Sequence, residues 1–262
     1  DWSSDVCSSD LVVVDSKWGR KLAEIAEIPV TTLSVESDVG DWTVSRRPFG
    51  YELRGEESVV LELPVNTDFA AANAALTLLI SRQQGVSLQD AVEAVKTARI
   101  PGRMESVARA GGVNFVVDYA HTPDAIERVL VAARNSRRDS GGRVLVVLGA
   151  GGDRDQAKRP LMGEAAGCHA DVVIIADDNP RTEDPAEIRR QIRVGAERKT
   201  AEVHEAATRH EAIRFAVEQA RSGDIVLVLG KGHETHQDFG DFLTPFDDRE
   251  VLASEVQRRM DY

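Results

Sequence analysis

Short apolar runs recur along the second part of the chain, and each run leads into a polar loop. The runs are Asn114–Val117, Arg143–Leu148, Val172–Ala176 and Asp224–Leu229. An apolar run of this length without helical spacing is typical of a strand buried on both faces of a sheet. Stretches with helical spacing follow the runs, over Pro123–Arg134, Leu161–Cys168, Pro185–Arg198 and Arg209–Arg221, and Ala201–His204 fits a further short strand. The alternation predicts right-handed crossovers and an α/β fold with a mostly parallel sheet.

The first part of the chain has a different pattern. Strands are expected at Leu11–Val14 and Val30–Leu33, helices at Trp18–Ala26, Phe69–Ser81 and Ser87–Thr97, and alternating positions from Trp42 to Leu63 predict antiparallel hairpins. The break at Ile100-Pro101-Gly102 predicts a boundary between domains at 11–100 and 101–262. Residues 1–10 are rich in Ser and Asp and are expected to be a non-native leader. The first residue is Asp1, so we expect a piece of a longer chain.

Composition narrows the classes of partner. The 262 residues carry a formal net charge of -12, with 29% charged residues. Such an acidic chain is not expected to bind nucleic acid or an anionic membrane surface, and no apolar run is long enough to predict membrane insertion. Cys7 and Cys168 are too few to form a disulfide framework, which favours a cytoplasmic location.

Four polar loops should emerge at one edge of the predicted sheet, where open α/β folds bind ligands. Three cations lie within six residues of one loop, Arg154, Lys158 and Arg159. Arginine grips carboxylate or phosphate groups in a bidentate fork, and Arg181 adds a second fork in the next loop. Asn179 adds an amide, and Glu234 could accept hydrogen bonds from an ammonium group. Together these groups suit an amino acid that carries both acid and amine groups.

Each of these residues also has a purely structural interpretation. His121 and His233 could be ordinary loop histidines, Arg159 could pair with Glu164, Asp177 and Asp178 could cap a turn, and Gly230 and Gly232 could serve turn geometry alone. No metal-ligand spacing of His or Cys and no serine-nucleophile motif is present. The coincidence of four ligand-capable loops favours a binding site.

Five motifs in order resemble the carboxyl-terminal domain of the Mur ligases, most closely those of the MurE type: IPGRMESV, DYAHTPDAIERVL, GGDRDQAKRPLMGEAA, DDNPRTEDP and GKGHE. The resemblance extends over about residues 15–262 and is strongest from Pro101 onward. It implies a Rossmann-like, mostly parallel sheet in residues 101–262. Residues 11–100 would then be the tail of a central α/β ATPase domain that includes some antiparallel strands.

The resemblance also implies an activity. It is that of an ATP-dependent, Mg²⁺-requiring ligase that adds meso-2,6-diaminopimelate to UDP-N-acetylmuramoyl-L-alanyl-D-glutamate in peptidoglycan synthesis. An acyl phosphate would be the intermediate. The enzyme would act on small molecules as a cytoplasmic monomer. No P-loop occurs in this chain, so we expect the isolated chain to be inactive and most Mg²⁺ ligands to lie upstream, with none in this chain.

Site residues follow from the resemblance by position. Arg103, Asp118 and His121 correspond to ATP-binding positions. Lys158 and His121 correspond to catalytic positions close to the reacting phosphoryl group and the nucleotide. The diaminopimelate-binding positions are Arg154, Asn179, Pro180, Arg181, Gly230 and Glu234.

Two alternative functions remain open. The chain could belong to a related Mur-like amide ligase that joins a different amino acid, such as lysine or glutamate. It could also be a module that binds an amino acid or nucleotide without catalysis. The sequence Asp-Asn-Pro-Arg at residues 178–181 favours diaminopimelate over lysine in this family. Asn66–Asn73 departs from the commoner family pattern, which leaves its adenine contacts open.

Overall fold

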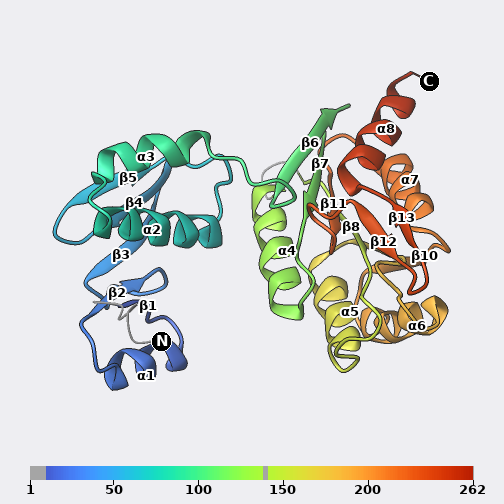
Figure 1. The fold of residues 1–262 in the computed structure, drawn as a ribbon. Coiled ribbons are helices and arrows are strands. Elements are labelled where there is room, and N and C mark those ends of the chain that lie inside the picture. The colour runs from blue at the N-terminus through green and yellow to red at the C-terminus, as the bar shows by residue number, and fades with distance from the viewer. Residues whose placement is uncertain (1–9, 138–140, 262) are drawn as a thin grey trace. The chain divides into compact units, whose positions relative to one another are not determined.

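The computed structural model describes residues 10–137 and 141–261. The chain divides into two compact units, with the division between Arg99 and Ile100 (Figure 1). Most of the predicted leader, residues 1–9, lies outside the described residues, and Asp10 is the first residue of a strand. None of the helices in the described residues combines the length and the apolar character needed to cross a bilayer.

From residue 10 onward, where the structure describes it, the first unit is a five-stranded sheet with three helices. Its strands lie in chain order: β1 (Asp10–Val13), β2 (Val30–Ser34), β3 (Trp42–Arg47), β4 (Gly50–Arg54) and β5 (Ser58–Leu61). The first three strands pair in parallel and the last three antiparallel, which confirms the hairpins predicted from alternation. The helices are α1 (Lys17–Ile25), α2 (Asp68–Gln83) and α3 (Leu88–Thr97), capped by the side chains of Ser16, Thr67 and Ser87. Apolar side chains of the sheet, α2 and α3 share one core.

The second unit has a six-stranded sheet in the order β10-β9-β8-β11-β7-β6. The strands are β6 (Glu105–Ala110), β7 (Val113–Asp118), β8 (Val144–Leu148), β9 (Val172–Ile175), β10 (Glu202–Glu205) and β11 (Ile225–Leu229). All neighbours pair in parallel except β6, which is antiparallel to β7 at one edge. The predicted mostly parallel sheet is therefore confirmed.

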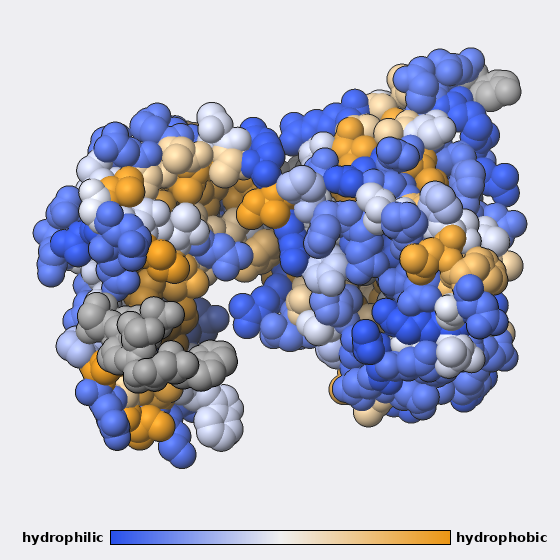
Figure 2. Space-filling view, viewed as in Figure 1, coloured by the Kyte–Doolittle hydropathy of each residue, from blue (hydrophilic) through white to orange (hydrophobic). Residues whose placement is uncertain are grey.

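In the described part of this unit, five helices cover the two faces of the sheet (Figure 1). They are α4 (Pro123–Arg137), α5 (Lys158–His169), α6 (Pro185–Ala196), α7 (Arg209–Gln219) and α8 (Asp248–Met260). Helices α4, α5 and α6 pack side by side on one face, and α7 and α8 pack together on the other. Alternate residues of β7, β8, β9 and β11 form the core with α7 and α8. The surface visible in Figure 2 is mostly hydrophilic on this unit.

Helices α5 and α6 are in backbone contact through glycine. A Cβ atom on Gly163 would overlap the carbonyl oxygen of Ile192, and one on Gly195 would overlap that of Pro160. Each glycine therefore faces the backbone of the other helix, and no larger residue fits without moving the helices apart.

Three elements of the second unit are not predicted from the sequence pattern. They are the edge strand β6, the helix α8, and a hairpin of β12 (His236–Asp238) and β13 (Leu243–Pro245). Strand β6 is only partly buried, and just two apolar side chains of α8, Leu252 and Val256, are buried. Neither element carries the strong apolar pattern on which the predictions depend.

Candidate functional site

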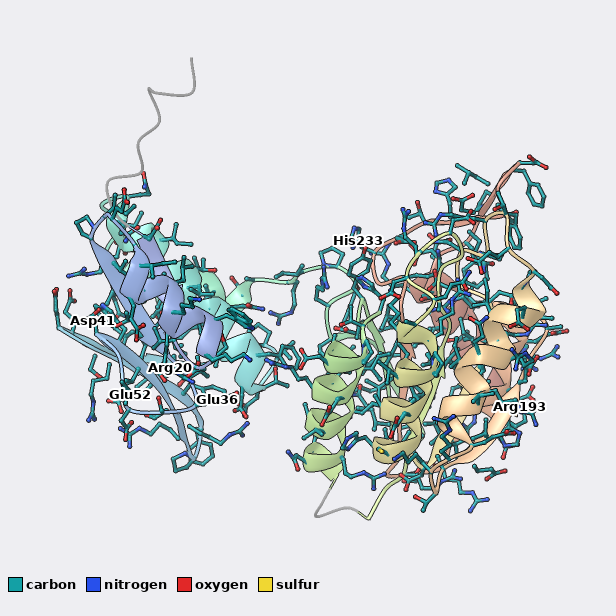
Figure 3. The ribbon with its side chains drawn as sticks, turned by 90° about the horizontal axis from the view of Figure 1, so that it is seen from below. Arg20, Glu36, Asp41, Glu52, Arg193 and His233 are labelled. Carbon is teal, nitrogen blue, oxygen red and sulfur yellow. The ribbon has the colours of Figure 1, made fainter. Side chains whose placement is uncertain are left out.

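Strands β7, β11, β8 and β9 are neighbours and run in parallel, so the loops after them leave at one edge of the sheet. This confirms the expectation that the four polar loops share a rim. Figure 3 shows His233, from the loop after β11, at the edge where α4 begins. The predicted site residues on these loops form two neighbouring groups, described in turn below.

Asp118 ends β7 and holds the loop that carries Arg103. Its Oδ2 accepts the backbone N–H of Met104, and its Oδ1 accepts that of Ala120, both at 2.7 Å. Burial raises the pKa of this carboxyl above its usual value, although both hydrogen bonds and the charge of Arg103 act to lower it. Met104 has a φ of 44°, a conformation that a non-glycine residue adopts only when its surroundings fix it.

Aromatic rings and one guanidinium group stack beside Asp118. The Arg103 guanidinium lies over the Tyr119 ring, 4.3 Å from its centroid. The ring of Tyr119 contacts His121 edge-on at 4.6 Å and His233 at 5.4 Å. A Cβ atom on Gly232 would lie 2.7 Å from the Tyr119 Cβ, so the loops after β7 and β11 are in direct contact. This cluster presents a cation and flat rings at the sheet edge.

Lys158, the first residue of α5, joins the same cluster. Its Nζ donates to the carbonyl oxygen of His121 at 3.1 Å. The ring of His121 is itself hydrogen-bonded, through Nδ1, to the carbonyl oxygen of Tyr119 at 2.8 Å. The two predicted catalytic residues are therefore adjacent in space.

Asn179, Lys231 and Glu234 form a closed triangle of hydrogen bonds. The Asn179 side-chain amide donates to Glu234 Oε2 at 2.9 Å, and Lys231 Nζ donates to Asn179 Oδ1 and to Glu234 Oε2, each at 3.0 Å. Burial acts to raise the pKa of Glu234, but the bonds from Asn179 and Lys231 outweigh it, so the pKa lies below its usual value. Glu234 is therefore a carboxylate at neutral pH.

Arg181 is held in a strained backbone conformation, with a φ of 52°. Its backbone N–H donates to the Asp238 carbonyl oxygen at 2.9 Å, and its Nε pairs with the Asp238 carboxylate at 3.2 Å. Its Nη1 donates to the carbonyl oxygen of Gly152 at 2.8 Å. Pro180, buried, precedes it and turns the chain.

Arg154 lies next to Arg181. A Cβ atom on Gly151 would be 2.9 Å from Arg181 Nη1 and 3.8 Å from Arg154 Cγ. Arg154 is exposed, and its Nη1 donates to the carbonyl oxygen of Asp153, which itself has a φ of 53°. The side chain of Arg181 thus reaches the loop that bears Arg154 and joins β8 to α5.

Gly230 follows β11 and has a φ of 117°. A Cβ atom there would lie 2.6 Å from Asp178 Oδ2. The loop after β11 therefore passes so close to the loop after β9 that only glycine fits, which places Gly230 beside the triangle of Asn179, Lys231 and Glu234.

One predicted ligand-facing cation is wrong. The side chain of Arg159 is fully buried, and its two terminal nitrogens donate to the Glu183 carboxylate at 2.8 Å. It also donates to Gln191 Oε1 and to the Gly151 carbonyl oxygen. The alternative pairing with Glu164 is also wrong, because Glu164 pairs with Lys199. Arg159 is used inside the protein, so it is not available to a ligand.

The structure gives specific contacts to residues to which the sequence assigned no individual role, although Lys231 was the one cation of the polar loop at residues 230–234. Lys231 lies fully buried in the triangle, although its position between two glycines could have drawn attention to it. Asp238 orients Arg181 from the β12–β13 hairpin, and no pattern in the sequence indicates this contact. Arg209 lies fully buried beneath the loops, and only its place at the start of a predicted helix was visible in the sequence.

Two open cavities lie away from these residues. One of about 600 Å³ lies along α8, and one of about 310 Å³ lies between β10 and α7. No predicted site residue lines either one. Within residues 10–137 and 141–261, no group of three or more His, Cys, Asp or Glu side chains is arranged to hold a metal ion.

Comparison with known protein families shows the family to which this chain belongs. Residues 102–232 match the family model described as Mur ligase, glutamate ligase domain. The chain belongs to the Mur ligase family. The matched residues include Asp118, Lys158 and Arg181, and thus most of the site described above.

Relatives of this Mur ligase chain include two curated bacterial proteins, each a UDP-N-acetylmuramoyl-L-alanyl-D-glutamate–2,6-diaminopimelate ligase. The protein of Chromobacterium violaceum is 50% identical over 191 residues, which cover 72% of this chain and 38% of that protein. The protein of Corynebacterium glutamicum is 37% identical over 268 residues, covering 97% of this chain and 51% of that protein. The chain therefore spans about half or less of the length of these relatives.

Solved structures give the same picture of the Mur ligase fold. A structure of a UDP-N-acetylmuramoyl-L-alanyl-D-glutamate–2,6-diaminopimelate ligase is 33% identical, with a TM-score of 0.60, and the match covers 97% of this chain and 54% of that one. A pseudomurein peptide ligase type C from Methanothermus fervidus has a TM-score of 0.68 at 12% identity, covering 95% of this chain and 56% of that one. At that identity the second likeness shows the fold alone.

Proposed function

We propose that the whole protein is an ATP-dependent ligase that adds meso-2,6-diaminopimelate to UDP-N-acetylmuramoyl-L-alanyl-D-glutamate in cytoplasmic peptidoglycan synthesis. The names of relatives at 37% and 50% identity support this. The observation that carries the proposal is that the loops bearing Arg154, Arg181 and Glu234 are in contact at one rim of the sheet. Arg181 Nη1 donates to the Gly152 carbonyl oxygen in the loop of Arg154, and the Asn179 side chain donates to Glu234 Oε2.

The pocket chemistry suits a diacid that also carries an ammonium group. Guanidinium groups bind carboxylates through paired hydrogen bonds, and Arg181 and Arg154 offer two such groups. Glu234 is the anion that an ammonium group would approach. Lysine has only one carboxylate and could engage only one of the two guanidinium groups, so the pair of arginines favours diaminopimelate.

The neighbouring cluster suits the nucleotide side. Arg103 is a cation for phosphate oxygens, Asp118 an acceptor beside the ribose, and His121 a neighbour of the nucleotide. In the proposed reaction the D-glutamate carboxylate takes the terminal phosphoryl group of ATP, which gives an acyl phosphate and ADP. The amine of diaminopimelate then attacks the acyl carbon and loses a proton as phosphate leaves and the amide forms.

We assign Lys158 the role of stabilising negative charge on the transferred phosphoryl group, and its contact with the His121 carbonyl oxygen on the proposed nucleotide side supports this. Such fixed cations act mainly by electrostatic stabilisation and by positioning. Mg²⁺ supplies further charge neutralisation when bound, and the proposal assigns no ligand of that ion to this chain.

A titration calorimetry experiment on residues 1–262 tests the amino-acid pocket. The unmodified chain should bind meso-diaminopimelate more tightly than L-lysine. Arg181→Ala should weaken binding by about 10- to 100-fold, the range for a charged hydrogen bond worth about 1.5–3 kcal/mol. Arg190→Ala is the matched control, because Arg190 is an exposed arginine paired with Glu187 on α6, outside the site. No binding by the unmodified chain, or equal binding by Arg181→Ala, would overturn the assignment.

Catalysis is tested separately from binding. The isolated chain should form no amide, whereas the full-length protein should release phosphate in a reaction that needs all three substrates. A full-length protein that binds diaminopimelate and releases no phosphate would favour the alternative of a binding module.

A further inference from the structure

Lys231 is a buried cation that contacts two predicted ligand-binding residues and is itself out of reach of solvent. Its side chain has a relative exposure of 0%, and its Nζ lies 3.0 Å from both Asn179 Oδ1 and Glu234 Oε2. A buried ammonium group is costly unless it is paired and hydrogen-bonded, and these two acceptors provide that compensation. Lys231 therefore holds Asn179 and Glu234 in place from inside the protein and does not itself face a ligand.

The two oxygens of Glu234 have different surroundings. Oε2 accepts hydrogen bonds from both Lys231 and Asn179. Oε1 accepts none from the residues that the structure describes, and the side chain of Glu234 is 34% exposed. One oxygen is thus fixed by the protein, and the other has no hydrogen bond from the described residues in a side chain that is partly exposed.

The loop geometry keeps Lys231 in this position. Gly230 and Gly232 flank it with φ angles of 117° and 55°, and both pack against neighbouring loops. The Glu234 backbone N–H donates to the Lys231 carbonyl oxygen at 2.9 Å, so the two residues belong to one tight turn. Rotation of the Glu234 carboxylate would break bonds to two buried partners.

We propose that Lys231 is a positioning residue that fixes Glu234 Oε1 toward one ammonium group of the bound amino acid. The proposal rests on the proposed function and deepens it. By occupying Oε2, the protein's own ammonium group leaves a single acceptor atom for the ligand. The pocket then favours a ligand with an ammonium group at that one point. A ligand that lacks this group does not gain the affinity that the contact with Glu234 Oε1 provides.

The test uses titration calorimetry of residues 1–262 with meso-diaminopimelate and with the two enantiomers of 2-aminopimelate. Each enantiomer keeps both carboxylates and lacks one ammonium group. The enantiomer that binds less tightly to the unmodified chain identifies the ammonium group that faces Glu234. Lys231→Met should weaken meso-diaminopimelate binding about 10- to 100-fold, as expected for a charged hydrogen bond. The same variant should change binding of the weaker enantiomer less than about threefold, because that ligand makes no use of Glu234.

Two further variants separate positioning from a general structural effect. Lys199→Met is the matched control, since Lys199 pairs with Glu164 outside the site and its loss should leave all affinities unchanged. Lys231→Gln keeps a hydrogen-bond donor without the charge, and serves if Lys231→Met does not fold. It should lose part of the preference for meso-diaminopimelate. In a Glu234→Gln background, replacing Lys231 should have no further effect on that preference.

The outcomes are distinguishable. If the unmodified chain binds no meso-diaminopimelate, the proposed function fails. If it binds, and the folded Lys231 variants keep the full preference for meso-diaminopimelate over the weaker enantiomer, only the role of Lys231 is overturned. An equal loss of affinity for all three ligands would also overturn it, because a merely structural residue acts in that way.

Discussion

Replacing Arg209 with methionine is expected to destabilise the second unit by about 3–5 kcal/mol, the cost of leaving one member of a buried ion pair without its partner. Arg209 and Asp248 both have side-chain exposures of 0%. Nε and Nη2 of Arg209 each donate to one Asp248 oxygen at 2.7 Å, and Nη2 also donates to the Leu229 carbonyl oxygen at 2.8 Å. Methionine removes all three bonds and leaves a buried carboxylate.

The surroundings of Arg209 stabilise its charge. Burial alone would lower the pKa of the Arg209 guanidinium, but the Asp248 carboxylate holds that pKa above its ordinary value. The guanidinium also lies 4.0 Å from Asp178 Oδ2, at the start of the loop after β9. The pair therefore joins the starts of α7 and α8 to two of the loops that form the site.

Urea unfolding measured by two probes gives the assay. All three tryptophans, Trp2, Trp18 and Trp42, precede residue 100, so their fluorescence reports the first unit, whereas circular dichroism reports both. The free energy of unfolding falls with urea at a slope of about 2 kcal/mol/M. A loss of about 3–5 kcal/mol should therefore lower the urea midpoint of the second unit by roughly 1.5–2.5 M.

The double variant Arg209→Met with Asp248→Leu is the control, because replacing both members of a buried pair by apolar side chains is often neutral. It should regain most of the lost stability. A midpoint shift below about 0.5 M for the single variant, or a double variant no more stable than the single one, would refute the reasoning.

Two further predictions concern single residues. In denaturant unfolding, Gly230→Ala should destabilise the protein more than Gly111→Ala. Both glycines have positive φ, so both substitutions strain the backbone. Only at Gly230 would the added Cβ also collide, at 2.6 Å from Asp178 Oδ2, because Gly111 has open space around it. Equal costs would contradict this. Hydrogen bonds from the buried Arg159 guanidinium, and then from the Asp153 backbone N–H, lower the pKa of the Glu183 carboxyl from 4.5 to about 2. The pair thus stabilises the fold above about pH 4.5, and this contribution is lost as the pH falls toward 2. Glu183→Gln should therefore be less stable than the unmodified chain at pH 6, and the difference in the free energy of unfolding should be smaller at pH 3. A difference that is the same at both pH values would contradict this.

The sequence predicts the central strands well because they are apolar at almost every position. The runs that became β8, β9 and β11 are fully buried, and only a parallel sheet covered on both faces buries such runs. Strand β6 and helix α8 could not be predicted, because they bury few apolar side chains. Their sequences therefore lack the apolar pattern that marks the central strands.

The shared rim of four loops follows from strand direction, and so it could be predicted. The direction of single side chains could not. Lys158 and Arg159 are adjacent on α5, and successive helical residues point about 100° apart. Lys158 therefore reaches the loop after β7, while Arg159 points inward to Glu183. Similarly, only the path of the turn decides that Lys231 lies inside the protein.

The glycine contact between α5 and α6 fixes the spacing of two loops of the site. Helix α5 follows the loop that bears Arg154, and α6 follows the loop that bears Arg181. The contact of the two helices at Gly163 and Gly195 thereby holds these two loops, and with them the two arginines proposed to bind diaminopimelate, at a set distance from each other. A methyl group added at either glycine would push the helices apart and shift one of the proposed arginines relative to the other, although every side chain at the rim would keep its identity.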